Sequence, residues 1–174
     1  MAMSPKERKQ KQLEREREEQ KVLPDSTYPY LRTPLHEHPV FDANISSVDL
    51  VFELMGIDPP VFEDDRGPAE FAHDACFSTD DDKEATFAGR KGAVGRAECM
   101  IHFLLDATME LSEIINRYKL NELDDRLKEI DAMDLSDPGE RKRALEAVVQ
   151  IEKLKDALGK NVRRTFRQWE VKGM

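Results

Sequence analysis

Residues 94–118 read VGRAECMIHFLLDATMELSEIINRY, and the spacing of apolar residues within this stretch is the strongest indication of secondary structure in the sequence. Mostly apolar side chains recur there in alternating steps of three and four residues, at Val94, Ala97, Ile101, Leu104, Thr108, Leu111, Ile115 and Tyr118. Such spacing places them on one face of a helix, as in the seam of a coiled coil. The spacing resumes after an offset near Asn121, at Leu120, Leu123, Leu127 and Ile130. The pattern predicts one helix from Gly92 to about Met133, roughly 60 Å long.

A second long helix is predicted after a turn at residues 136–140, which read SDPGE. Asp137 can cap this helix, Pro138 suits its first position and Glu140 closes a capping box. One face of the helix is marked by Leu145, Val148, Ile151, Leu154, Leu158, Val162, Phe166 and Trp169. Because the connection is only about four to six residues long, the two helices must run antiparallel. We therefore expect an all-α fold built on a long antiparallel helical hairpin at residues 93–169.

The sequence divides into three parts. Residues 1–22 predict a charged helical arm that starts with a capping box at Ser4 and Glu7, and Leu13 is the one apolar residue between Lys6 and Lys21. Residues 23–45 predict an extended segment, because a proline recurs there every five residues. We expect this Pro-rich segment to pack on the helices and bury its tyrosines, with docking on a partner as the alternative. Residues 46–174 form the predicted helical domain.

Short helices are expected between the Pro-rich segment and the hairpin. One should be capped at Ser46-Ser47 and stop at Gly56. Another should run from Pro68 to Ala75 and place Phe71 in the core. The acidic residues at 63–65 and 80–82 are interpreted as loops on either side of that second helix.

Composition limits the function classes. The 174 residues have a formal net charge of -9, so the chain as a whole repels nucleic acid unless its basic residues are gathered in one place. Two cysteines do not form a disulfide framework, and no stretch approaches the length of a membrane span. The N-terminus is charged where a secretory signal would be apolar. These observations favour a cytoplasmic protein with reduced thiols and no membrane partner.

Two mirrored Cys/His pairs are the candidate metal ligands: His73 with Cys76, and Cys99 with His102. Zinc binds cysteine and histidine in tetrahedral sites, which makes it the one candidate cofactor. The short knuckles that usually present such ligands are missing. The favoured interpretation is therefore that the cysteines are core residues, that His102 is a buried histidine and that the chain has no cofactor.

Basic residues form two candidate nucleic-acid contacts and one candidate anion site. The nucleic-acid candidates are Lys6, Arg8, Lys9 and Lys11 in the arm, and Arg163, Arg164 and Arg167 near the C-terminus. The alternatives are a solvated charged helix and a helix C-terminus that favours cations. The anion candidates, Arg90, Lys91 and Arg96, surround glycines where the long helix begins. The alternative there is a flexible hinge.

Several motifs resemble a family of uncharacterised small proteins from phages and prophages of proteobacteria. They are SPKERKQ at 4–10, PDSTYPY at 24–30, DDRGP at 64–68, GRAE at 95–98, DLSDP at 134–138 and WEVKG at 169–173. The resemblance implies a phage accessory protein in the cytoplasm of a host cell, and it implies no chemistry. Such a protein usually acts on a host or phage macromolecule.

The sequence therefore favours an interaction protein over an enzyme. It would bind a host or phage protein through the hairpin, modulate regulation or defence, and form a homodimer, because the distal end of a two-helix hairpin leaves leucines uncovered. The first alternative is a nucleic-acid-binding regulator that uses the basic arm and the C-terminal arginines. A metal-dependent enzyme built on the Cys/His pairs is the other.

Overall fold

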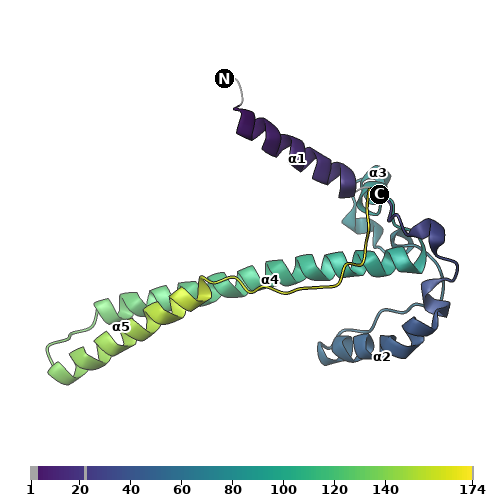
Figure 1. Ribbon diagram of the computed structural model, residues 1–174. Helices are drawn as coiled ribbons and strands as arrows, with labels where there is room; N and C mark the ends of the chain where they lie inside the picture. The colour runs from purple at the N-terminus through teal and green to yellow at the C-terminus, as the bar shows by residue number, and fades with distance from the viewer. Residues whose placement is uncertain (1–3, 22, 174) are drawn as a thin grey trace. The chain divides into compact units, whose positions relative to one another are not determined.

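The computed structural model describes residues 4–21 and 23–173, in which every regular element is a helix. These residues contain five α-helices and four short 3₁₀ turns, and no strand occurs among them (Figure 1). The all-α class predicted from the sequence is confirmed. The chain divides into two compact units, of which the second is Leu104–Phe166 and the first contains the rest. No helix in the described part has both the length and the apolarity needed to cross a bilayer.

Helix α1, Pro5–Lys21, forms the predicted arm, whose end residues 1–3 and 22 lie outside the described residues. Its capping box is present: the Ser4 amide donates to Glu7 at 2.6 Å, and the Glu7 amide donates to the Ser4 hydroxyl at 3.3 Å. Arg15 and Glu19 pair along the helix at 2.9 Å. Leu13 is exposed, so the helix is supported by local pairs worth a few tenths of a kcal/mol each.

The Pro-rich segment is less extended than predicted, and the helix that follows it starts earlier. The segment contains two 3₁₀ turns, Tyr28–Tyr30 and Leu35–Glu37, and helix α2 occupies Pro39–Leu54. Helix α2 starts earlier than predicted because His38 caps it: the His38 Nδ1 accepts from the Val40 amide at 3.2 Å. Ser46 and Ser47 consequently lie inside the helix.

The stretch between α2 and the long helix also differs from the prediction. Two 3₁₀ turns, Pro68–Glu70 and Asp74–Cys76, replace the expected short helix, and Phe71 is exposed. Helix α3, Asp80–Thr86, begins in the acidic run that was predicted to be a loop. Thr79 caps α3 by accepting from the Asp82 amide at 3.1 Å, and carboxylates in the first turn are favoured by the helix dipole.

Helix α4, Gly92–Asp131, is the predicted long helix, and its 40 residues correspond to roughly 60 Å. Asp65 caps its start by accepting from the Ala93 amide at 2.8 Å. This approach requires glycine at position 92, where φ is +64° and an added Cβ would lie 2.6 Å from the Asp65 carboxylate. Gly89, with φ +76°, similarly allows the Pro24 backbone to approach to 2.7 Å from where a Cβ would be.

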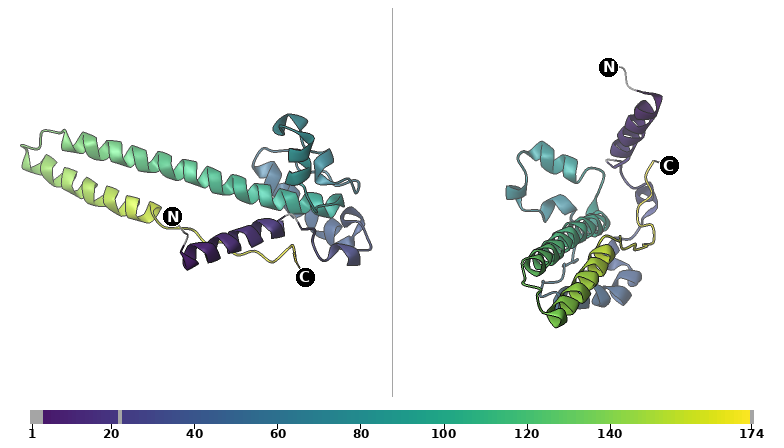
Figure 2. Two further views of the ribbon diagram at one scale, coloured as in Figure 1. Left: turned by 90° about the horizontal axis from the view of Figure 1, so that it is seen from above. Right: turned by 90° about the vertical axis from the view of Figure 1, so that its left-hand side faces the viewer.

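Helix α5, Pro138–Leu158, starts as predicted, with the Asp137 carboxylate accepting from the Glu140 amide at 2.8 Å. It lies beside the C-terminal part of α4 (Figures 1 and 2). A small buried cluster joins the two helices; its buried members are Ile130, Ala144 and Ile151, with Leu123, Leu127, Leu135, Ala147 and Val148 packed around them. This cluster is the apolar core of the second unit.

The end of α5 corrects the predicted hairpin boundary. The helix stops at Leu158 instead of continuing to Trp169, and residues 161–173 have no regular structure. Gly159 follows the last helical residue, and glycine disfavours helix by about 1 kcal/mol. Val162 and Phe166 of the predicted apolar face are mostly exposed, whereas the Trp169 ring lies 5.6 Å from the His102 ring without any helix to carry it.

The thin core of the second unit gives the first prediction. Ile151→Ala should lower the free energy of unfolding by about 2–4 kcal/mol. The substitution removes most of a buried side chain and leaves a cavity that the few neighbouring core residues cannot fill. The control, Leu145→Ala, truncates an exposed side chain of the same helix and should cost less than about 0.5 kcal/mol. Urea denaturation followed by circular dichroism measures both. Equal losses in the two variants would show that this cluster is not the core.

Candidate functional site

An uncovered, mostly apolar face lies on α4. We define the α4 seam as five residues at coiled-coil spacing: Leu104, Thr108, Leu111, Ile115 and Tyr118. The four larger side chains are 43% to 61% exposed, and Thr108 is exposed as well. Apolar side chains that continue along a rigid helix without cover are typical of surfaces that bind another protein.

The α4 seam is uncovered because α5 packs on a different face of α4. The residues of α4 that pack against α5 include Leu123, Leu127 and Ile130. At about 100° per residue, these positions are rotated by roughly a third of a turn from the seam. The offset in the apolar spacing near Asn121 therefore marks the point at which the apolar residues move from one face of α4 to another. In addition, α5 ends opposite Asn116, whose side-chain amide donates to the Leu158 carbonyl at 2.9 Å.

The flanks of the α4 seam carry little charge. The residues in the two rows beside it are Leu105, Ala107, Ser112, Ile114 and Lys119. Glu113 and Arg117 lie on the helix away from the seam and approach each other at 3.8 Å. A surface of this kind suits an apolar helix better than a strongly charged partner.

The structure does not bring the predicted metal ligands together. His73 and Cys76 are exposed at a 3₁₀ turn, whereas Cys99 is buried in α4, and burial raises the pKa of its thiol to about 11. His102 lies 2.8 Å from Glu170. Among the described residues, no three His, Cys, Asp or Glu side chains lie close enough to hold a metal ion.

The predicted nucleic-acid contacts are exposed and dispersed. Lys6, Arg8, Lys9 and Lys11 lie on α1, which also carries carboxylates, among them Glu7 and Glu14. Arg163, Arg164 and Arg167 are exposed in the irregular residues after α5 and not at the helix end where the sequence placed them. Nucleic-acid binding by either group stays a prediction.

The three predicted anion-binding residues do not converge. Arg90 donates to Glu170 at 3.0 Å, Lys91 is exposed, and Arg96 is buried between two phenylalanine rings. The start of α4 already holds the Asp65 carboxylate. The helix dipole is therefore satisfied within the chain.

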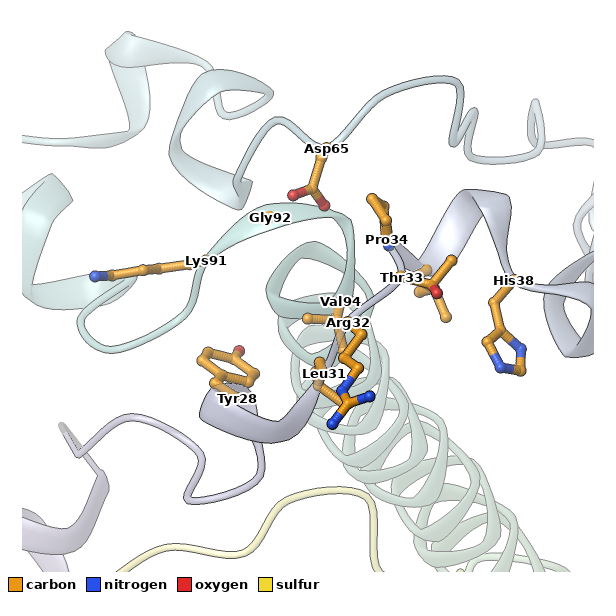
Figure 3. A pocket seen from close by; sticks show the side chains of 11 residues that line it. Tyr28, Leu31, Arg32, Thr33, Pro34, His38, Asp65, Lys91, Gly92 and Val94 are labelled. Atoms are coloured by element: carbon orange, nitrogen blue, oxygen red, sulfur yellow. The ribbon is translucent and has the colours of Figure 1, made fainter.

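A cavity of about 410 Å³ lies beside the start of α4 (Figure 3). Its lining includes Tyr28, Arg32, His38, Asp65 and Lys91. Figure 3 shows the Arg32 and Lys91 side chains extending in different directions, so their charges do not meet at one point. The cavity therefore offers no focused charge to a small ligand.

A buried polar cluster, which the sequence did not predict, attaches the C-terminal residues to the rest of the first unit. Glu170 accepts from Arg90 at 3.0 Å and lies 2.8 Å from the His102 ring. Asp25, which is buried, accepts from the Val171 amide at 3.2 Å. Glu98 is 4% exposed and accepts from the Tyr28 hydroxyl. The sequence carried one signal of this cluster: Glu98 is the single acidic residue between Val94 and Leu105.

Two carboxylates of this cluster, Glu98 and Glu170, have pKa values shifted in opposite directions. Burial raises the pKa of Glu98 to about 7, and the nearby carboxylates of Glu170 and Asp25 add to the increase. Burial also acts to raise the pKa of Glu170, but hydrogen bonds from His102 and Arg90 and the positive charges of Arg90 and Lys172 outweigh it and lower that pKa. Glu170 is thus held ionised, whereas Glu98 is protonated below about pH 7.

Comparison of the chain with protein-family models, with curated proteins and with solved structures found no match. Its function is therefore inferred from the surfaces and side-chain geometry of the chain itself.

The pKa of Glu98 gives a pH prediction. An unfolded glutamate titrates near pH 4.5 and folded Glu98 near pH 7, so the unfolded chain releases this proton first as the pH rises. Stability from this residue should fall between about pH 5 and 7, and Glu98→Gln should remove that fall. The expected difference between the two proteins exceeds about 1 kcal/mol across the window.

Denaturation series from pH 5 to pH 8 measure this difference. Glu170→Gln is the matched control: it should lower stability throughout this range, because the pKa of Glu170 is lowered and its charge is present from below pH 5 upward. Parallel curves for the unmodified chain and Glu98→Gln would contradict the assignment.

Proposed function

We propose that this chain acts by binding other proteins and that the α4 seam is its binding surface. The observation that supports the proposal is an exposed row of apolar residues with coiled-coil spacing on a long helix. Burying each Leu or Ile of that row would contribute up to about 1.5–3 kcal/mol.

The second unit provides the support for this surface as an antiparallel hairpin of α4 and α5. The contacts follow an antiparallel order: Asn116 bonds to Leu158, and Asp124 pairs with Lys155 at 2.7 Å. Farther along α4, Ile130 packs with residues nearer the start of α5. Pairing of this kind stiffens the helix, so the side chains of the seam are held in position before a partner binds.

The first partner we propose is a second copy of the chain. The α4 seam has the periodicity that lets two identical helices pack side chains into each other's gaps. Its flanking rows have one charged residue, Lys119, so two copies meet little repulsion there. Homodimers with two-fold symmetry are the commonest soluble assemblies.

In addition to the second copy, we propose a host or phage protein as the biological partner. By binding this protein, the dimer would modulate regulation or defence. This part of the proposal rests on the motif resemblance described above. A dimer of hairpins would place two copies of the first unit in one assembly. Once one copy has bound a partner, the other copy is held near it at a high effective concentration, which favours a second contact with the same partner.

The proposal predicts that charge in the α4 seam prevents dimer formation. Leu111→Glu should shift the protein to a monomer, because two copies would then bury unpaired carboxylates at the centre of the seam. Met109→Glu adds the same charge at an exposed apolar residue of α4 on another face and should leave the dimer intact. Size-exclusion chromatography with light scattering gives the mass of each variant.

Circular dichroism must show the same helix content in both variants. A dimer that persists in Leu111→Glu, or that is lost only in Met109→Glu, would place the interface elsewhere.

A further inference from the structure

The side chain of Arg96 has an unusual environment in the first unit. Arg96 lies on α4 and is 5% exposed. Its guanidinium carbon lies 4.4 Å from the centre of the Phe62 ring and 3.9 Å from the centre of the Phe71 ring. Cation–π contacts with two rings offset part of the cost of burying the charge.

The hydrogen-bonding capacity of Arg96 is not used. Its Nε, Nη1 and Nη2 atoms are buried and have no hydrogen-bond partner among the described residues. The nearest carboxylate oxygen, on Asp64, is 3.7 Å from Nη1, which is too long for a hydrogen bond. Asp64 already accepts from Arg66, at 2.7 Å from both Nε and Nη2. A buried guanidinium without hydrogen bonds is costly, so it is an expected place for a ligand.

Arg96 is one of the residues that line an apolar cavity, although its guanidinium nitrogens are themselves buried. The volume of the cavity is about 460 Å³, within the range of small-molecule sites. The walls include Phe71, Phe87, Cys99, Met100 and Phe103. Among the described residues that line the cavity, Arg96 is the only charged one. One charge at the wall of an apolar space is the arrangement that holds a molecule with an apolar body and one ionised end.

We propose that this cavity binds a small amphipathic monocarboxylic acid, with its apolar part against the phenylalanines and its carboxylate on Arg96. The planar fork of arginine matches a carboxylate through two parallel hydrogen bonds. A phosphate is disfavoured because its second charge would lie close to Asp64 and Asp65.

Because the guanidinium nitrogens of Arg96 are buried, a ligand reaches them only if the loop at residues 57–67 moves. Pro60 and Val61 form part of the cavity wall, and Val61 is exposed. Residues 57–67 have no regular secondary structure, so few backbone hydrogen bonds resist a displacement there. The carboxylate would reach the guanidinium edge as this loop shifts.

The test compares octanoate with octanol, which have the same chain length and differ in the charged end. Calorimetric titration of the full-length chain should show octanoate binding at least about tenfold more tightly than octanol, through charge-assisted hydrogen bonds. Arg96→Gln should abolish this preference and leave octanol binding unchanged. Ala72→Leu, which narrows the cavity while keeping Arg96, should weaken both ligands.

The comparison of two ligands on the unmodified chain decides the proposal even where a variant does not fold. Equal affinity for octanoate and octanol, or binding of neither, would overturn it. Because the α4 seam takes no part in this site, Leu111→Glu should bind octanoate normally, so loss of dimer formation and loss of ligand binding are distinguishable.

Discussion

Along α4 the apolar residues shift from one face of the helix to another, and the packing of the second unit follows from this shift. Beyond Leu120 these residues face α5 and form the small cluster around Ile130 and Ile151. Before Tyr118 they lie on a face that α5 does not cover. A helix of 40 residues with one uninterrupted stripe could bury it against a single long partner. Here the 21-residue α5 covers only the second stripe, and the side chains of the α4 seam stay exposed.

The first part of α4 is buried by contacts that carry more polar groups than a helical core usually has. Glu98 and Arg96 are both nearly covered, one against Tyr28 and the other between two phenylalanines. Buried charges are costly and persist where they are paired or have a role. Glu98 belongs to the cluster that attaches the C-terminal residues. Arg96 has no equivalent hydrogen-bond partner among the described residues and does not belong to that cluster. It is instead one of the residues that line the apolar cavity.

Local signals in the sequence were sufficient to predict the helices that begin with strong caps. The capping box at Ser4 and the Asp137 cap set the starts of α1 and α5, and hydrophobic spacing set the extent of α4. The start of α2 was missed because a histidine, which is not a common cap, provides it. The end of α5 was missed because the apolar spacing continues to Trp169, although Val162 and Phe166 are 82% and 61% exposed. Contacts across long sequence separations, such as Tyr28 with Glu98, leave no local pattern to detect.

The residues of the α4 seam could likewise be predicted from spacing, whereas their exposure could not, because it depends on which face α5 covers. Sedimentation equilibrium of the unmodified chain across a dilution series measures whether two copies associate. We expect a reversible equilibrium between the 20.0 kDa monomer and a species of twice that mass. A single 20.0 kDa species at every concentration would contradict this expectation.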